Sequence, residues 1–330
     1  MIAFVVSTWN SRMELEPFLD SLDKVLPIGH ECKLVFIDQG SEDGSVDYLR
    51  NQQKFGRDFS LLADDHKTSW CNANERGIIK ALNDNRTDWL AISNPDIIFT
   101  EDFKTLVEYV NSLKPPYPIV SCLLMKKDGT LQGKPVRNLN FLYMLVYETV
   151  FGSMIDKFIF GDRNKRAFTK TLNEIPNVPM RVEHPAMSFF MIHKDTLAKT
   201  LLGEPWGKAY TWARADSDLC RMAAAKGIKV VLLGNVRIIH EGTHSYKRYS
   251  KSSQKADFAF GTILFCRYWG EHPRLFTLAY FIDAFVGMAF RIAPRHPQKR
   301  SSLREEIHRS ATVFKGIYYA WTRKVVQHQV

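Results

Sequence analysis

The chain has 330 residues, which suffice for one large domain or two modest ones, and 45% of them are apolar, 24% charged and 12% aromatic. These proportions are those of an ordinary folded protein and exclude a disordered or low-complexity chain. Five widely spaced cysteines without a C-x-x-C pair argue against a disulfide framework or a zinc knuckle and favour a reducing compartment. The net charge of +10 is concentrated in residues 241–330, where 15 Lys and Arg stand against 6 Asp and Glu. Such a basic tail is compatible with binding to nucleic acid, with binding to anionic lipid, or with a role in solubility only. The charge alone does not distinguish these roles.

The first 125 residues alternate short apolar runs with helical patterns. We expect strands at residues 2–7, 33–38, 60–63, 89–93 and 119–124, and helices at residues 13–26, 46–53, 74–82 and 102–113. Continuous apolar strands, each followed by a helix, indicate an α/β fold whose mostly parallel sheet is covered by helices. The run that begins at Ile2 is too short for a signal peptide and lacks a basic start, so we expect a cytoplasmic protein.

The second half of the chain is less regular. Asp128-Gly129 predicts a tight turn in a hairpin over residues 123–132, and residues 138–177 read as a largely helical insertion or cover. Further elements are expected as strands at residues 187–192, 228–233 and 236–239, and as a helix that starts at Asp216. A basic loop at residues 243–255 then leads into helices rich in aromatic residues.

Two acids follow predicted parallel strands, at the edge where such sheets bind ligands. Asp38 precedes a Gly/Ser turn and could accept hydrogen bonds from a nucleoside, although an Asx-turn that launches the next helix is the favoured interpretation of this segment alone. Asp96 ends the Asn94-Pro95-Asp96 segment, where proline fixes the backbone and the carboxylate could hold Mg²⁺ or Mn²⁺. The alternative for Asp96 is a turn residue before a helix that Thr100 caps.

Two further polar sites lie in the second half. Asp216 falls in the first turn of a predicted helix, where it could serve as a general base or only cap the helix. Asp218 is assigned to structure, as a partner of Arg221. His240 ends an apolar strand and could ligate a metal, or it is a buried, hydrogen-bonded histidine. No G-x-G-x-x-G motif follows a predicted strand, which argues against a dinucleotide-binding protein. No Walker A motif is present either.

In this order, the motifs resemble family 2 glycosyltransferases with the GT-A fold, and most closely the bacterial branch of rhamnosyltransferases that build O-antigen and capsule. The quoted segments are Ser7-Thr8-Trp9-Asn10, Ile37-Asp38, Asn72-Ala73-Asn74-Glu75-Arg76-Gly77, Ser93-Asn94-Pro95-Asp96, Asp216-Ser217-Asp218-Leu219-Cys220, and His240 followed by Ser245. They cover the chain from Met1 to about Ser245.

The resemblance implies a role for each of these residues. Asp96 and His240 would bind the metal, and Asp216 would be the catalytic base. The donor contacts would come from Thr8, Asn10, Asp38, Asn72, Asn74, Arg76 and Asn94. Three departures are informative: Ala215 replaces the usual Glu before the base, Gln39-Gly40 replaces Asn-Gly/Ala, and Pro185-Ala186-Met187 replaces a Gly-rich acceptor wall. These departures leave the acceptor and the sugar open.

The implied domain is a GT-A glycosyltransferase domain over residues 1–245, with a nucleotide-sugar half at residues 1–125 and an acceptor half at residues 126–245. A basic, aromatic helical region would follow at residues 246–330. The implied activity is inverting, Mg²⁺- or Mn²⁺-dependent transfer of a sugar from a dTDP- or UDP-linked donor, rhamnose first among them. The acceptor would be a hydroxyl group of a surface glycan or of a lipid-linked glycan, and no nucleic acid would be bound.

The C-terminal region holds one long apolar segment, residues 275–292. It could span a membrane by length, but Asp283 in its middle costs about 2.5–3.5 kcal/mol, so a helix lying on the anionic inner face of the cell membrane is preferred to a spanning one. An ordinary core or dimer helix is about equally compatible. Two other functions stay open: a nucleotide-sugar-forming nucleotidyltransferase, which should carry a Gly-rich loop after the first strand, and a non-catalytic nucleic-acid binder, which leaves Asp96, Asp216 and His240 unexplained.

Overall fold

The computed structural model describes residues 1–26, 31–52, 58–132, 136–137, 140–163, 172–200, 210–211, 213–240, 242, 251–292 and 303–323. The chain divides into two compact units. Unit 1 comprises Met1–Arg137, Lys170–Thr211 and Leu219–Arg248, and unit 2 comprises Asn138–Thr169, Trp212–Asp218 and Tyr249–Val330. Unit 2 therefore joins the C-terminal region to residues 138–169, which the sequence had placed in the acceptor half.

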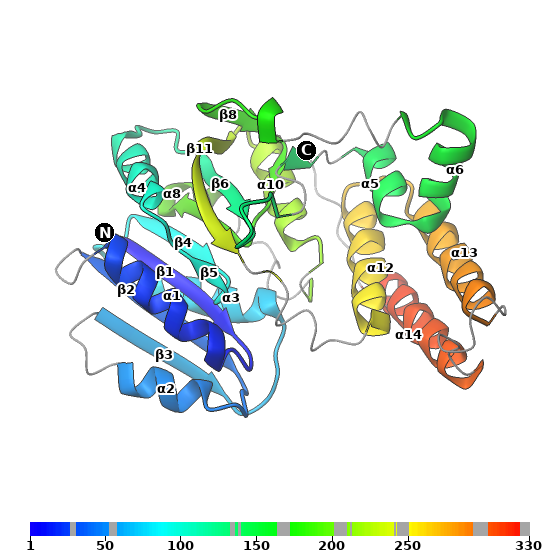
Figure 1. Cartoon of the computed structure of the whole chain (residues 1–330), viewed down its shortest axis with the longest axis horizontal. Helices are drawn as coiled ribbons and strands as arrows, with labels where there is room; N and C mark the ends of the chain where they lie inside the picture. Colours follow the sequence, from blue (N-terminus) through cyan, green and yellow to red (C-terminus); the bar gives the residue numbers. More distant parts are fainter. Residues whose placement is uncertain are drawn as a thin grey trace. The chain divides into compact units, whose positions relative to one another are not determined.

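A nine-stranded sheet forms the centre of unit 1 (Figure 1). Its strands are β1 Ile2–Thr8, β2 Cys32–Gln39, β3 Asp58–Asp64, β4 Trp89–Ser93, β5 Ile97–Ile98, β6 Ile119–Met125, β8 Pro179–Val182, β10 Phe189–His193 and β11 Val230–His240. The order is β3-β2-β1-β4-β10-β6-β11-β5, and β8 also pairs with β11. Strands β3, β2, β1 and β4 are parallel, β10 runs antiparallel to β4 and β6, and β11 is parallel to β6. The predicted α/β sheet is confirmed, with the antiparallel strand β10 at its middle and the short strands β5 and β8 antiparallel to β11.

Helices of unit 1 follow its strands as the alternation predicts. They are α1 Arg12–Val25, α2 Ser45–Gln52, α3 Trp70–Leu82, α4 Asp102–Ser112 and α8 Lys194–Thr200. Helix α3 begins four residues earlier than predicted because the side chain of Ser69 caps it, accepting a hydrogen bond from the Asn72 amide at 3.1 Å. The core between α1, α4 and the sheet is a group of buried aromatic rings, with Phe99 4.7 Å from Phe103 and 5.3 Å from Phe18 between ring centroids.

Strand β11 unites the two strands predicted at residues 228–233 and 236–239. Its register against β6 shifts between Leu233 and Arg237, so one bulged strand replaces two straight ones. Gly234 lies in this bulge, where an added Cβ would come within 2.0 Å of the Pro176 carbonyl oxygen. The hairpin after β6 is confirmed by the Lys126 amide, which donates to the Thr130 carbonyl at 2.8 Å. Beside it, β7 (Val136–Arg137) pairs with β9 (His184–Pro185) in a small separate sheet.

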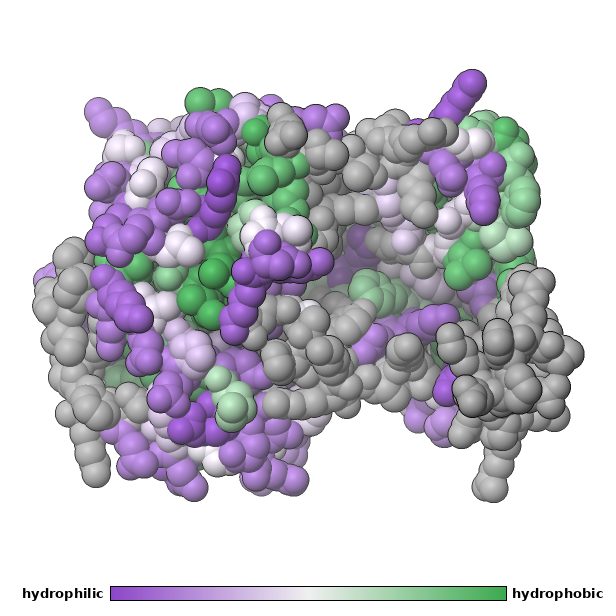
Figure 2. All heavy atoms as spheres, viewed as in Figure 1, coloured by the Kyte–Doolittle hydropathy of each residue, from purple (hydrophilic) through white to green (hydrophobic). Residues whose placement is uncertain are grey.

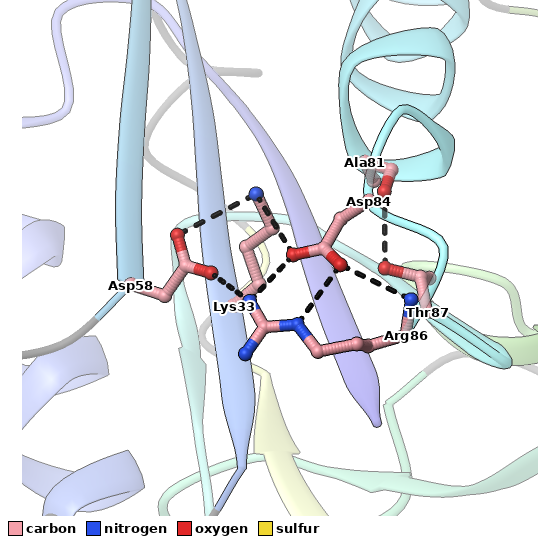
Figure 3. Close-up of polar contacts among 6 residues, drawn as sticks. All are labelled: Lys33, Asp58, Ala81, Asp84, Arg86 and Thr87. Atoms are coloured by element: carbon pink, nitrogen blue, oxygen red, sulfur yellow. Dashed lines mark hydrogen bonds and ion pairs between the residues drawn. The ribbon is translucent and has the colours of Figure 1, made fainter.

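The amino ends of β2 and β3 carry a cluster of paired charges (Figure 3). Asp84, in the turn before β4, accepts from Arg86 Nη2 at 2.7 Å and lies 3.4 Å from Lys33 Nζ. Arg86 also reaches Asp58 at 3.1 Å. The hydrogen bonds from Arg86 hold the pKa of Asp84 below its ordinary value. We name Lys33, Asp58, Asp84 and Arg86 the amino-edge cluster, and each of its charges faces an opposite one.

Unit 2 is helical in every element that the structure describes. It holds α5 Phe141–Glu148, α6 Val150–Phe160, α12 Lys251–Tyr268, α13 Pro273–Ile292 and α14 Leu303–Thr322, and α10 Ala215–Ala225 begins in it. The helical interpretation of residues 138–177 is thus confirmed for α5 and α6. Among the described residues, none of the helices combines the length and the apolar character that a membrane span needs. Asp283 has a local role, because its carboxylate accepts the first amides of α6, from Val150 and Phe151, at 2.7 Å each.

Candidate active site

The predicted metal ligands Asp96 and His240 meet in the structure. Asp96 follows β4, and β5 begins one residue later and pairs with the end of β11, where Ile97 lies opposite His240. This pairing brings Asp96 Oδ1 to 3.1 Å from His240 Nε2, across 144 positions of sequence. Asp96 is 9% exposed and His240 is 6% exposed. The two-residue strand β5 is therefore what assembles the pair.

The groups that contact Asp96 and His240 influence which protonation states these two residues can adopt. Gly242 donates its amide to Asp96 Oδ2 at 3.0 Å, and Gln132 Oε1 contacts His240 Nδ1. With hydrogen on Nδ1 toward Gln132 Oε1, the Nε2 atom of His240 can hold a proton or a metal ion beside the Asp96 carboxylate. Such an arrangement calls for a positive charge at Nε2, supplied by a proton or by a metal ion.

Asp96 is held in its ionised form. Burial alone would raise its pKa, but the hydrogen bond and charge of His240, together with the Gly242 amide, outweigh burial and leave the pKa below its ordinary value. Asn94 completes the group, with Nδ2 at 3.4 Å from His240 Nε2. Two of these partners, Gln132 and Gly242, were not predicted, because Gln132 comes from the hairpin and only the fold brings it to His240.

Asp38 lies at the carboxyl end of β2, directly opposite Thr8 at the end of β1. Its Oδ1 accepts the Ser41 amide at 2.8 Å, and its Oδ2 accepts the hydroxyls of Ser41 at 2.6 Å and Thr8 at 3.0 Å. This is the Asx-turn that the sequence favoured for the segment alone. Asn10, with a φ of +50°, is tied to the same turn by its amide, which donates to Ser41 Oγ at 2.7 Å. A nucleoside contact by Asp38 stays a prediction.

Gly40 fits this turn tightly for two reasons. Its φ is +69°, a region that favours glycine, and an added Cβ would approach the backbone of His66 to 2.9 Å. The loop after β3 thus packs against the loop after β2. The turn around Asp38 is consequently fixed from both sides.

Helix α3 brings the predicted donor residues Asn74 and Arg76 to the same edge of the sheet. Asn74 is fully buried, and its amide nitrogen donates to Ser7 Oγ at 3.2 Å and to the Trp70 carbonyl at 2.8 Å. Arg76 Nη1 contacts both carboxylate oxygens of Asp64, at 2.7 and 2.6 Å, at the end of β3. Asn72 lies in the first turn, where its amide is capped by Ser69. Asp64 was not predicted, because it is an ordinary strand-ending acid in the sequence.

Strand register places these residues along one edge. Thr8 lies opposite Asp38, and Val6 lies opposite Ser93, so the segment from Asn94 to Asp96 continues β4 beyond the same edge. The carboxyl ends of β1, β2 and β4 thus carry the predicted residues Thr8, Asn10, Asp38, Asn94 and Asp96, while α3 contributes the other donor residues and the end of β11 contributes His240. We name this group of residues the carboxyl-edge site.

Asp216, the predicted base, belongs to unit 2. It lies in the first turn of α10 and is partly exposed, and its Oδ1 accepts the Ser217 amide at 2.9 Å. Asp218 is buried and accepts the indole N–H of Trp269 at 2.6 Å, and its predicted pairing with Arg221 stays a prediction. The residue before Ala215, Arg214, has a φ of +72°. The meeting of Asp216 with the carboxyl-edge site stays a prediction.

Comparisons with known proteins extend this description. The family model described as glycosyl transferase family 2 matches residues 3–196. None of the curated proteins matches the chain. Among solved structures, a mannosyltransferase of Pyrobaculum calidifontis in complex with GDP-Man and Mn²⁺ is 12% identical with a TM-score of 0.50, covering 98% of this chain and 76% of that one.

Two further solved structures are similar over nearly the whole chain. GalNAc-T7 with UDP, GalNAc and Mn²⁺ is 13% identical with a TM-score of 0.56, covering 98% of this chain and 58% of that one. Residues 1–349 of TarS from S. aureus, in complex with UDP-GlcNAc, are 10% identical with a TM-score of 0.52, covering 97% of this chain and 81% of that one. At these identities the likeness establishes the fold.

Proposed function

The chain belongs to glycosyl transferase family 2, and from that premise we propose that it is an inverting enzyme that moves a sugar from a nucleoside-diphosphate donor to an acceptor hydroxyl group. The observation that carries this proposal is the buried contact of Asp96 with His240 at the carboxyl edge of the sheet. A buried acid and an imidazole nitrogen held 3.1 Å apart can form a hydrogen-bonded ion pair, or they can act together as ligands of one cation. They suit a site where a diphosphate and its counter-ion bind.

The donor atoms present fit a divalent ion. Ligands in adjacent positions of a six-coordinate ion with bonds of about 2.1 Å are separated by about 3 Å, which is the separation of Asp96 Oδ1 from His240 Nε2. Within the described residues no third acid, His or Cys joins them as a metal cage. Mg²⁺ and Mn²⁺ commonly take few protein ligands and fill the remaining positions with water and phosphate oxygens. Bound there, the ion would neutralise charge on the leaving diphosphate.

The residues at the ends of β1 and β2 would bind the nucleoside. Thr8, Asn10 and Asp38 form one hydrogen-bonded turn together with Ser41. Asn72, Asn74 and Arg76 on α3 would approach the donor from the neighbouring strand, and Asn94 would lie between them and the metal ligands. A preformed turn of this kind binds at little entropic cost because its loops need no reordering.

Asp216 is the base that we propose. An acceptor hydroxyl is a weak nucleophile with a pKa far above neutrality, so a carboxylate must take its proton as it attacks the anomeric carbon. One direct displacement of this kind inverts the configuration. The location of Asp216 in the first turn of α10 favours the ionised form, because the helix dipole stabilises negative charge there.

The donor and acceptor are the finer parts of the proposal. Solved neighbours hold GDP-Man, UDP-GlcNAc or UDP, which supports a nucleotide-linked donor without selecting one. The resemblance of the motifs to rhamnosyltransferases makes dTDP-linked rhamnose the first donor to test, and UDP-linked hexoses the next. We propose a surface glycan, such as O-antigen or capsule, or a lipid-linked precursor of one, as the acceptor, at the cytoplasmic face of the membrane.

A donor screen tests the proposed function. Purified protein is incubated with UDP-, dTDP- and GDP-linked sugars, with Mn²⁺, with Mg²⁺ and with a chelator, and release of the nucleoside diphosphate is measured. We expect metal-dependent hydrolysis of one donor class. Replacement of Asp216 by Asn should lower transfer to an acceptor by about 10²–10⁴-fold and leave donor affinity nearly unchanged. Hydrolysis of no donor under any condition, or wild-type transfer by the Asp216→Asn variant, would contradict the proposal.

A further inference from the structure

Helix α6 in unit 2 exposes apolar side chains and buries polar ones, the reverse of an ordinary surface helix. Val150, Met154 and Phe158 recur at helical spacing and are 48%, 39% and 76% exposed. The opposite stripe holds Gly152 and Asp156, which is only 1% exposed. Hydrophobic burial against the rest of unit 2 therefore does not explain the composition of α6. Its outer face is built for contact with something else.

Helix α13 exposes further apolar side chains. The carboxylate of Asp283 receives the first amides of α6 and so joins the start of α6 to the middle of α13. On α13, Leu278 and Phe285 are 52% and 55% exposed. Figure 2 shows hydrophobic surface over α6 and the adjoining part of α13. We name the exposed set the α6–α13 apolar surface: Val150, Met154, Phe158, Ile159, Phe160, Leu278 and Phe285.

Positive charge surrounds this surface in the sequence and on the helices. Lys157 shares the outer face of α6, and Arg274 is exposed at the start of α13. In the sequence, the segment after α6, residues 161–170, contains four Lys or Arg and one Asp, and the segment after α13, residues 293–300, contains three Lys or Arg and no Asp or Glu. An apolar face bordered by cations matches a bilayer with anionic headgroups.

A second copy of the chain fits this surface less well. In a two-fold dimer the same patch faces itself, so the basic segments of one protomer would meet those of the other. Like charges at close range oppose association.

We propose that the α6–α13 apolar surface docks on an anionic membrane, with its apolar side chains among the acyl chains and its cations at the level of the phosphates. The helices would lie in the plane of the interface, as expected where no helix of the described residues can span a bilayer. This proposal rests on the proposed function in one respect: a lipid-linked acceptor would be presented at that interface. Unit 2 would then be the part of the chain that binds the membrane.

Vesicle sedimentation of the full-length protein tests the proposal. Vesicles of phosphatidylcholine are compared with vesicles in which phosphatidylglycerol replaces a third of the lipid, at low and high salt. We expect binding to the anionic vesicles and weakening by salt. Phe158→Ser should lower the partition coefficient about tenfold or more, because one large side chain no longer leaves water. Met13→Ser is the matched control, since Met13 on α1 is also 76% exposed, and it should bind as the wild type does.

The following outcomes of these experiments would overturn the proposal or separate it from the proposed function. Equal vesicle binding by the wild type and the Phe158→Ser variant, or binding indifferent to lipid charge, would overturn the assignment of this surface. A dimer in size-exclusion chromatography that Phe158→Ser dissociates, without vesicle binding, would assign the surface to a second copy and also overturn the proposal. Metal-dependent donor hydrolysis in solution, measured on the same variants, separates failure of this inference from failure of the proposed function.

Discussion

The two edges of the sheet in unit 1 both carry acids, but the acids differ in what satisfies them. In the amino-edge cluster, Asp84 is paired with Arg86 and Lys33, and Arg86 is 61% exposed at its side chain. At the carboxyl-edge site, Asp96 is buried and its main side-chain partner is the imidazole of His240, 3.1 Å away. The charge of an acid paired with Arg or Lys is already balanced by a permanent cation, so that acid needs no metal ion. An acid paired with an imidazole can exchange that partner for a metal ion.

The largest effect expected from this difference is on activity. Asp96→Asn removes the charge that would hold the metal, and we expect donor hydrolysis to fall by about 10²-fold or more, with loss of its Mn²⁺ dependence. The matched control is Asp84→Asn, which removes an acid of the opposite edge and should leave hydrolysis unchanged. Equal losses of hydrolysis in the two variants would remove the distinction between the edges.

A second effect concerns the packing that supports the carboxyl edge. An added Cβ at Gly77 would lie 2.3 Å from Ile37 Cδ1 and 2.6 Å from Val5 Cγ1, so α3 could not keep its place on β1 and β2. We expect Gly77→Ala to lower the free energy of unfolding by about 1–3 kcal/mol, and donor affinity to fall with it. Gly129→Ala is the comparison variant: Gly129 has open space around it but a φ of +79°, so an added Cβ there causes backbone strain without a packing clash. Denaturant titration and donor titration measure the two quantities.

The pH dependence of stability tests whether Asp96 is ionised in the folded protein. The folded pKa of Asp96 lies below the unfolded value of about 3.9, so its contribution to stability is fully present above that value and is lost as pH falls through the folded pKa. Urea unfolding of the wild type and of Asp96→Asn should therefore differ by a constant amount from pH 7 to about pH 5. The difference should shrink below about pH 4. A difference that grows on acidification would contradict the assignment of an ionised Asp96.

The smallest effect is expected at the amino edge. Arg86→Ala removes an exposed guanidinium, and exposed ion pairs contribute little because solvent screens them. We expect a slight fall in Tm that high salt abolishes, with unchanged donor hydrolysis. A large fall in Tm would mean that the amino-edge cluster, and not the aromatic core, holds β2 and β3 together.

Sequence patterns predicted the secondary-structure elements and the motifs better than they predicted which motifs come into contact in the fold. The strands that became β1, β2, β4 and β6 were evident because each is a continuous apolar run, buried on both faces. The antiparallel direction of β10 and the two-residue strand β5 were not, because neither leaves a periodic pattern. Asp96 and His240 were both identified as ligands, yet their contact depends on β5.

The direction of β10 has an evolutionary consequence. Because β10 runs against β4, its chain enters at the edge where β4 leaves, and Ser188 accepts the amide of Asn94 at 2.9 Å. The segment just before it, Pro185-Ala186-Met187, therefore borders the donor residues while lying outside the parallel strands. Under the proposed function, exchange of this short segment among relatives would change the acceptor side and leave the strands of the proposed donor site untouched.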